Sequence, residues 1–367
     1  MYGLVHPAAE TGCEIATVET VINTAKRMAG VKRLGLNWRA IMSGLARTKI
    51  ILDNCEPSLL SGPRSLNSSR IPEVALFQTK GALAMTDLGT KRVQGTINYI
   101  RNPVPPGGVP LTFVTEQDEL STMETLPGTP MWIEDLRGQE TSLDREGFAL
   151  IPHKSGVENF HLIEEDAATD KLYSDEIAAL VKKLTGASHV FMQGGGKKRY
   201  GPKATDQLVG LTNALPALYP HGDTIDKSAL ELAQRILDYV PGLSLDGRRW
   251  AHYNIWRPIT PPPQDYPLAL CDTRTISPTD RETVIAHTVT RAMGEMKFET
   301  AGYMHNPSHR WCYFSNMTPD EVLVFITHDS DPTRPHQVAH TAFLDPTCPP
   351  NTPTRASVEM RALVLFE

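Results

Sequence analysis

The sequence has little cysteine, and its five cysteines form no pattern. They are odd in number and scattered, at Cys13, Cys55, Cys271, Cys312 and Cys348, with no CxxC pair. This arrangement argues against a disulfide framework and against a cysteine-based structural zinc site. It favours a protein of a reducing compartment.

Long apolar runs and basic stripes are also absent from the sequence. No run approaches the roughly 18 apolar residues of a membrane span. The first twenty residues contain three glutamates and no continuous apolar core, so a secretory signal is not expected. The net charge is −6, from 36 basic and 42 acidic residues, which makes nucleic acid a poor default partner. We therefore expect a cytoplasmic protein that binds neither membrane nor nucleic acid.

Residues 1–75 differ in texture from the rest of the 367-residue chain. Helix-like fragments such as ATVETVINTAKRMAG precede SLLSGPRSLNSSRIP, whose composition is typical of a linker or mobile loop. We expect a helical or irregular N-terminal extension over 1–75 and one large domain over 76–367. No chemistry is expected from the extension, which would suit a lid or the contact of a homodimer.

Strand-length apolar segments, broken by turn residues, dominate the predicted domain. They include TINYI, MWIEDL, FALIP, SHVFMQ, WAHYNIWRPI, PLALCD, WCYFSNM, EVLVFITHD, AHTAFLD and SVEMRALVLF. The basic segment GGGKKRYGPK lacks the GxxxxGK[ST] order of a phosphate-binding loop and is expected to be a surface turn between two strands. Because no helix regularly separates the strands, the expected fold class is mainly β with flanking helices, as in a jelly roll.

Two helices are expected among these strands. The first runs from Ser174, a plausible N-cap, to Leu184, and Gly186 ends it. The second covers 226–240. Its predicted apolar face consists of Leu230, Ala233, Ile236 and Leu237.

The stretch LYPHGDTIDKSALELAQRIL places a His-Gly-Asp triplet just before the second helix. Residues i and i+2 of an extended segment point to the same side, so His221 and Asp223 can bind one metal ion. Gly222 lets the backbone approach closely. A redox-active iron site uses two imidazoles and one carboxylate on one face of the ion. The alternative is a turn before a helix, with Asp223 as the helix cap.

The third ligand has to come from another strand, because facial ligands converge from different directions. The C-terminal candidates are His328, His336 and His340. His340 is favoured because it opens a strand-like segment fifteen positions before Arg355, and His336 is its main rival.

A dicarboxylate anchor is predicted at the start of the last strand. Arg355 and Ser357 are again i and i+2, so both can face the interior of a barrel. An arginine fork with a hydroxyl beside it suits the distal carboxylate of a small dicarboxylic acid. Arg361 is the alternative anchor.

Two further residues, in HYNIWRPI, are expected to line the cavity that binds cosubstrate or substrate. These are Asn254 and Arg257, since a buried amide or guanidinium near a site usually pairs with a polar partner. Strict alternation would place them on opposite faces of the strand. Arg257 could instead brace the barrel through a carboxylate such as Asp272.

The order His-x-Asp, distant His, then Arg-x-Ser resembles the Fe(II)/2-oxoglutarate-dependent oxygenases. More specifically, the chain resembles the fungal AsaB-like hydroxylase/desaturase family related to cephalosporin methoxylase components. The segments that carry the resemblance lie over roughly 90–367 and include IEDLRGQETSLDREGFALIPH, LTGASHV, YNIWRPI and NPSHRWCYFSNMTPDEVLVF. The resemblance implies a cupin-like double-stranded β-helix, Fe(II) bound by His221, Asp223 and His340, and 2-oxoglutarate anchored by Arg355.

The implied enzyme is a non-haem iron dioxygenase that consumes 2-oxoglutarate and O2 and releases succinate and CO2. Its substrate would be a small-molecule intermediate of fungal secondary metabolism, which it would hydroxylate, desaturate or oxidatively cyclise. Two alternatives stay open from the residues alone. A zinc-dependent hydrolase or lyase would leave the Arg355 motif without a purpose. A non-catalytic accessory barrel would have no reason to keep three converging ligands.

Overall fold

The computed structural model describes residues 91–101, 110–114, 121–203, 215–290 and 294–367. These belong to one compact unit, Thr79–Glu367. The extension predicted over 1–75 lies outside the described residues, so the boundary at 75 stays a prediction. No helix among the described residues is long and apolar enough to span a membrane.

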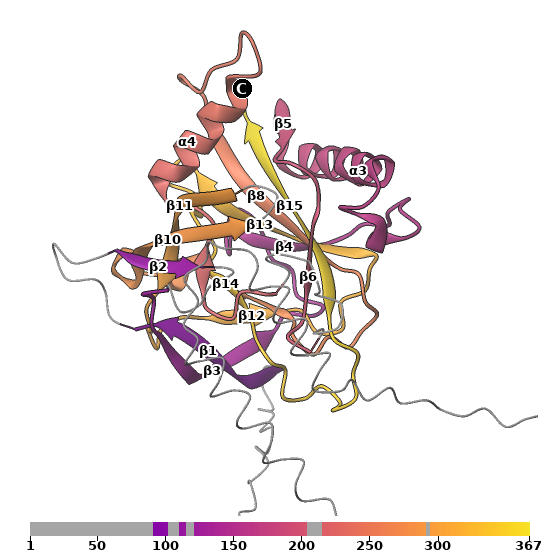
Figure 1. Ribbon diagram of the computed structural model, residues 1–367, viewed down its shortest axis with the longest axis vertical. Coiled ribbons are helices and arrows are strands. Elements are labelled where there is room, and N and C mark those ends of the chain that lie inside the picture. Colours follow the sequence, from indigo (N-terminus) through magenta and orange to yellow (C-terminus); the bar gives the residue numbers. More distant parts are fainter. Residues whose placement is uncertain (1–90, 102–109, 115–120, 204–214, 291–293) are drawn as a thin grey trace, which may run out of the picture. The chain divides into compact units, whose positions relative to one another are not determined.

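Two β-sheets form the domain (Figure 1). The larger has the strand order β1-β3-β12-β9-β14-β7-β11-β10-β2. Its strands are β1 (Arg92–Ile100), β2 (Leu111–Val114), β3 (Thr125–Asp135), β7 (His221–Gly222), β9 (Leu268–Cys271), β10 (Arg281–Thr290), β11 (Gly294–Tyr303), β12 (Trp311–Tyr313) and β14 (His340–Ala342). Most pairs are antiparallel, while β12 pairs with β3 and β10 with β2 in parallel.

The smaller sheet has the order β4-β13-β8-β15-β5, and β6 also pairs with β15. Its strands are β4 (Phe148–Pro152), β5 (His189–Met192), β6 (Lys197–Tyr200), β8 (Trp250–Pro258), β13 (Glu321–Asp329) and β15 (Ala356–Leu365). The sequence predicted a mainly β fold of the double-stranded β-helix type, and this prediction is confirmed. The basic segment at 194–203, predicted as a turn, contributes a strand of its own, β6.

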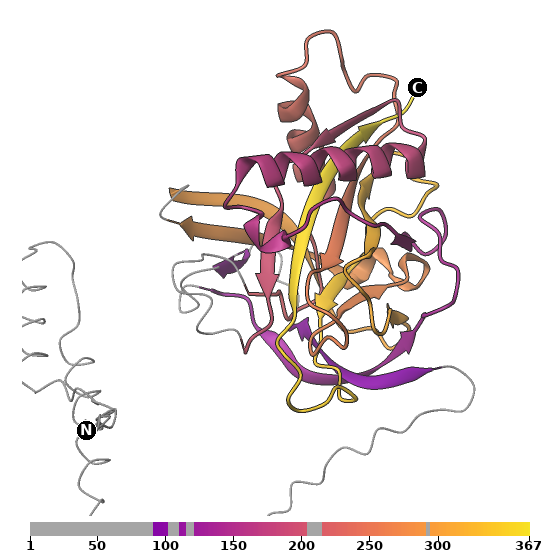
Figure 2. The same ribbon diagram turned by 90° about the vertical axis from the view of Figure 1, so that its right-hand side faces the viewer.

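Alternation along β15 gives the smaller sheet two different faces. Even positions such as Val358, Met360 and Ala362 are buried in an apolar core together with Ile177 and Val181 of helix α3 (Ala167–Thr185). Figure 2 shows α3 lying across this sheet next to β15 and β5. Glu359 and Arg361, at odd positions, point the other way, toward the larger sheet. Helix α3 therefore covers one face of the smaller sheet. The polar residues at odd positions of β15 lie on the other face, in the interior between the two sheets.

Helix α3 spans Ala167–Thr185, so it begins earlier than the sequence predicted. Asp166 is the N-cap, and its side chain accepts a hydrogen bond from the backbone N–H of Thr169 at 2.8 Å. Ser174 lies inside the helix, which corrects its predicted capping role. The predicted end is right: Gly186 adopts φ 70°, the left-handed conformation that glycine accommodates at a helix C-terminus.

Helix α4 spans Asp226–Leu237, three residues shorter than predicted. Its buried residues are Ala229, Ala233 and Leu237, while Leu230 is 40% exposed. The predicted face was therefore displaced around the helix. The small side chains of Ala229 and Ala233 let the helix axis come close to the sheet. A prediction from hydrophobicity alone ranks leucine above alanine and therefore misses this.

Candidate metal and cosubstrate site

The two predicted histidine ligands lie on neighbouring strands of the larger sheet. Antiparallel pairing of β14 with β7 puts His340 directly opposite His221. Their ring centroids are 4.2 Å apart. The third ligand is therefore remote in sequence but adjacent in the sheet.

Asp223 follows β7 and completes the cluster. The ligand atoms of His221, Asp223 and His340 all lie within 4.8 Å of one another. The His340 Nε2 atom is 3.8 Å from Asp223 Oδ2. Donor atoms bound to one ion at about 2.1 Å stand about 3 Å apart in cis positions, so a small inward movement would bring all three onto a metal.

Backbone carbonyls orient both imidazoles. The Nδ1 atom of His221 is 3.1 Å from Tyr219 O, and Nδ1 of His340 is 3.1 Å from Val338 O. A carbonyl only accepts, so each Nδ1 carries the hydrogen and each neutral ring keeps its Nε2 lone pair for a metal. Burial, and then the nearby His340 ring, lower the pKa of His221 to about 4, so this ring is neutral at pH 7.

Two residues of the smaller sheet hold the Asp223 carboxylate. Asn254 Nδ2 donates to Oδ2 at 2.6 Å, and Arg361 Nη2 donates to Oδ1 at 2.6 Å. Asn254 and Arg361 are themselves cross-strand partners in the β8–β15 pair. Burial alone would raise the pKa of Asp223, but Arg361 and then the histidines lower it to about 2, so the carboxylate is ionised.

Gly222 sits where a side chain would not fit. A Cβ atom there would lie 2.5 Å from the side-chain Cδ of Gln337. Gln337 is buried and fixed, because its Nε2 donates to Thr224 O and its Oε1 accepts from the Tyr303 hydroxyl at 2.8 Å. Glycine is therefore required between the two ligands for the close approach that the sequence predicted.

Arg355 has unused hydrogen-bonding capacity beside this cluster. It is only 2% exposed, and its Nη1 donates to Ser357 Oγ at 2.8 Å. Its Nε and Nη2 atoms have no partner among the described residues. Burial lowers the pKa of Arg355 to about 10, which still leaves it charged at pH 7. Unpaired buried N–H groups on a cation are costly, so they mark a place for an anion.

A cavity of about 130 Å³ joins Arg355 to the three predicted metal ligands. Its apolar walls include Phe113, Tyr219, Trp256, Leu268, Phe298 and Phe325. The Phe325 ring packs 4.7 Å from that of His340, and the Arg355 guanidinium lies 5.5 Å from the centre of the Trp256 indole. An anion at Arg355 and an apolar molecule against the walls would thus share one cavity with the metal.

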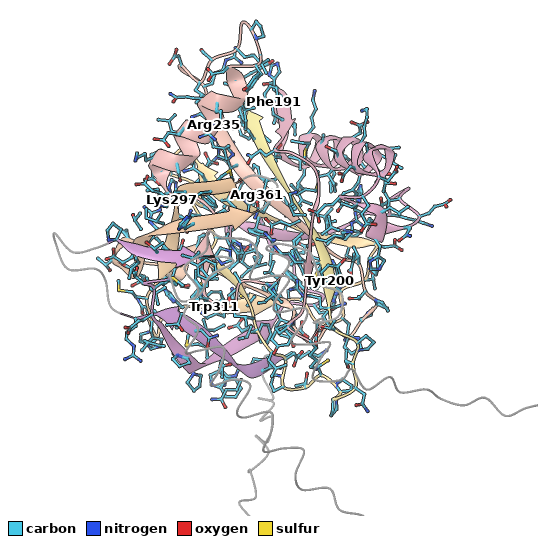
Figure 3. The ribbon with its side chains drawn as sticks, viewed as in Figure 1. Phe191, Tyr200, Arg235, Lys297, Trp311 and Arg361 are labelled. Carbon is cyan, nitrogen blue, oxygen red and sulfur yellow. The ribbon has the colours of Figure 1, made fainter. Side chains whose placement is uncertain are left out.

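Arg361, the alternative anchor, is already engaged. Besides Asp223 it binds Glu359, with its Nη2 atom 2.7 Å from the carboxylate. Figure 3 labels Arg361 near the middle of the domain. It lies on the same face of β15 as Arg355, but its charge is balanced by two carboxylates. This distribution of partners favours Arg355 over Arg361 as the anion anchor.

Arg257 lies on the opposite face of β8 from Asn254 and does not line the cavity. Its guanidinium is wholly buried and donates to the Tyr173 hydroxyl at 3.0 Å, to His153 O at 3.0 Å and to Pro319 O. This corrects the expectation that Arg257 binds substrate, and the alternation of the strand explains why. The suggested brace to Asp272 is also absent, since Asp272 pairs with Arg274 and Arg310.

The rival ligand His336 lies outside this cluster, with its Nε2 atom 2.8 Å from Asp226. Asn254 is near the metal ligands as expected, but it holds Asp223 instead of lining the cavity. The residues that the sequence did not assign to this role are thus Asn254 and Arg361 as the pair that positions the carboxylate. The sequence did carry a signal for this pair, namely even spacing along the two strands. Asn254 is two residues from Trp256, and Arg361 is six residues from Arg355.

Comparison with known proteins agrees with this geometry. Residues 97–365 match the family model described as oxidoreductase/YMDC permease-like domain. The chain is 30% identical to the hydroxylase/desaturase efuI of Hormonema carpetanum over 292 residues, which cover 75% of this chain and 95% of that protein. The chain belongs to this family of fungal oxidoreductases.

Two further likenesses define the kind of oxidoreductase. The Fe(II)/2-oxoglutarate-dependent dioxygenase nvfI of Aspergillus novofumigatus is 30% identical over 63% of this chain and 81% of its own. A solved structure of the iron and alpha-ketoglutarate-dependent endoperoxidase NvfI is 25% identical, covers 75% of this chain and 98% of its own, and superimposes with a TM-score of 0.65. The chain is accordingly a non-haem iron, 2-oxoglutarate-dependent oxidoreductase, which removes the zinc hydrolase and the accessory barrel from consideration.

Proposed function

We propose that His221, Asp223 and His340 bind Fe(II), and that Arg355 binds the distal carboxylate of 2-oxoglutarate in the adjoining cavity. The observation that carries this proposal is the buried Arg355: its Nε and Nη2 atoms have no partner among the described residues, and it lines the same cavity as the three ligands. The donor set suits iron, because it combines two neutral imidazoles with an ionised carboxylate. Ser357 supports the anchor by accepting from Arg355 Nη1.

The residues around the proposed iron site have separate physical tasks in this proposal. Tyr219 O and Val338 O fix the tautomer and orientation of the imidazoles. Asn254 and Arg361 keep the Asp223 carboxylate ionised and turned toward the histidines. Aromatic walls exclude water, which strengthens the attraction between Arg355 and an anion. When bound, iron, 2-oxoglutarate and O2 supply the oxidising power, and 2-oxoglutarate leaves as succinate and CO2.

The proposed substrate is a small, largely apolar intermediate of fungal secondary metabolism. Phe113, Phe298 and Phe325 supply contact area for apolar carbon near the proposed iron position. The proposed outcome is hydroxylation, desaturation or oxidative cyclisation. The cytoplasmic location and the homodimer remain predictions from the sequence.

The Arg355 assignment is tested with two keto acids, 2-oxoglutarate and 2-oxopentanoate, which lacks the distal carboxylate. Both are titrated against the Fe(II)-loaded protein without oxygen, using Arg355→Ala and, as a matched control on an exposed arginine, Arg235→Ala. Losing one partner of a buried charge pair costs about 2–4 kcal/mol, so Arg355→Ala should weaken 2-oxoglutarate binding about 30- to 1000-fold. Binding of 2-oxopentanoate should be nearly unchanged.

The ratio between the two keto acids is the decisive quantity. The wild-type chain and Arg235→Ala should prefer 2-oxoglutarate strongly, and Arg355→Ala should lose that preference. If Arg355→Ala keeps the wild-type preference while Arg361→Ala loses it, Arg361 is the anchor and the assignment of Arg355 is wrong.

A further inference from the structure

A second group of two histidines and one aspartate lies outside the proposed iron site. Asp226 is the first residue of α4, His328 lies near the end of β13, and His336 follows in the segment that leads to β14. One ligand atom from each lies within 4.8 Å of the other two. The three residues come from three separate segments, so only the tertiary fold assembles them.

His336 is already turned toward Asp226. Its Nδ1 atom donates to Asp329 O at 3.0 Å and its Nε2 atom donates to Asp226, so a metal ion would take the place of the hydrogen on Nε2. That Nε2 atom is 2.8 Å from Asp226 Oδ1. An imidazole whose far nitrogen donates to a carbonyl is the usual arrangement of a metal-binding histidine.

His328 is the most buried member of this group. The residue is 6% exposed. Its Nδ1 atom faces Asp226 Oδ1 at 3.9 Å, and its ring stacks on Trp250 with centroids 4.6 Å apart. Burial lowers the pKa of His328 to about 3, so the ring is a neutral donor at pH 7.

We propose that Asp226, His328 and His336 form a second divalent-cation site, of the type that binds Zn²⁺. Donor atoms about 2.0–2.1 Å from a tetrahedral ion stand about 3.3 Å apart, between the two separations of 2.8 Å and 3.9 Å observed here. Three protein ligands leave a fourth position for water. Asp226 has an exposed side chain, so solvent reaches the site from its side.

Arg281 opposes the cation and limits its affinity. Its Nη1 atom is 3.6 Å from Asp226 Oδ1, so the guanidinium competes with a metal ion for the same carboxylate. Removing this charge should therefore strengthen cation binding. A site that only served as a salt-bridge network would respond in the opposite way, by losing order.

An ion at this second site would tie together the two chain segments that carry the proposed iron ligands. Asp226 follows Asp223 by three residues, and His336 precedes His340 by four. Because a ligand that binds only the folded state stabilises it, Zn²⁺ should raise the thermal midpoint of the folded chain. The inference concerns this stabilising site and does not depend on which small molecule is oxidised.

The test measures Zn²⁺ stoichiometry by equilibrium dialysis and elemental analysis of the full chain after metal removal. The proteins are the wild type, His336→Ala, the double variant His221→Ala/His340→Ala, and the combination of all three changes. His161→Ala, which removes an exposed histidine outside both groups, is the matched control. We expect two equivalents of Zn²⁺ in the wild type and in His161→Ala, one in His336→Ala, one in the double variant, and none when all three changes are combined. Circular dichroism confirms that each variant is folded.

Two further readouts separate a true site from chance binding. Zn²⁺ should raise the thermal midpoint of the His221→Ala/His340→Ala variant, and this shift should disappear when His336→Ala is added. In the same double-variant background, Arg281→Ala should lower the Zn²⁺ dissociation constant severalfold. If folded His336→Ala retains two equivalents, or if the double variant binds no Zn²⁺, the second site does not exist.

Discussion

The molecule contains two groups with the same composition, two histidines and one aspartate, but in different surroundings. In the first, the side chains of Asp223 and His340 are 7% and 5% exposed, and a cavity lined by Arg355 adjoins them. In the second, those of Asp226 and His336 are 63% and 37% exposed.

The difference shows what a ligand group needs beyond its ligands. The first group adjoins a cavity where an anion and an apolar molecule could lie against a metal ion, so it suits chemistry. In the second group Asp226 and His336 are open to solvent, so it suits an ion that stabilises the fold. Composition alone would assign both groups the same role.

The largest expected effect comes from removing one histidine from each group. His340→Ala should lower 2-oxoglutarate turnover more than about 100-fold, because even the loss of a hydrogen-bond partner of a metal ligand typically costs 10- to 100-fold. His336→Ala should leave turnover within about twofold of the wild type. Succinate release is the measurement, with iron content determined in parallel. Equal losses in the two variants would remove the functional distinction between the groups.

A smaller effect is expected at Asn254, which donates to Asp223 of the first group. Asn254→Ala should weaken Fe(II) binding about 10- to 100-fold, because the carboxylate loses the donor that orients it. Zn²⁺ binding at the second group should not change. The check is an anaerobic Fe(II) titration beside the Zn²⁺ titration; a change confined to the Zn²⁺ titration would contradict the positioning role.

The smallest effect is expected from Gly222→Ala, which probes the close packing around the first group. The added Cβ would press on the Gln337 side chain and should cost about 1–3 kcal/mol of unfolding free energy. Gln337→Ala in the same chain should restore part of this loss, because the two changes couple. Urea unfolding of the wild type, the two single variants and the double variant gives the four unfolding free energies of this double-mutant cycle. Additive losses would mean that Gln337 is not the obstacle.

The sequence predicted the parts of the first group that follow from alternation within one strand. His221 with Asp223, and Arg355 with Ser357, are i,i+2 pairs, and each pair lies together in the structure. Alternation alone could not decide whether Arg355 or Arg361 is the anchor, because Arg361 in β15 and Arg355 just before it fall on the same face. Only the neighbours brought by folding, Asp223 and Glu359, distinguish them.

Other features depend on tertiary contacts that no local pattern carries. The second group joins a helix start, a strand end and a loop, so its members have no regular spacing. The hairpin formed by β10 and β11 was not predicted, although these are among the longest strands. For Arg257 the alternation in HYNIWRPI already argued against the cavity, and the structure agrees with the alternation.

The most direct test of the central claim is an anaerobic titration followed by visible spectroscopy. Fe(II) and then 2-oxoglutarate are added to the wild type, His340→Ala and His336→Ala, and the weak charge-transfer band of the chelate is recorded. We expect the band in the wild type and in His336→Ala, and none in His340→Ala. A folded wild type without the band, or a band that survives in His340→Ala and disappears in His336→Ala, would contradict it.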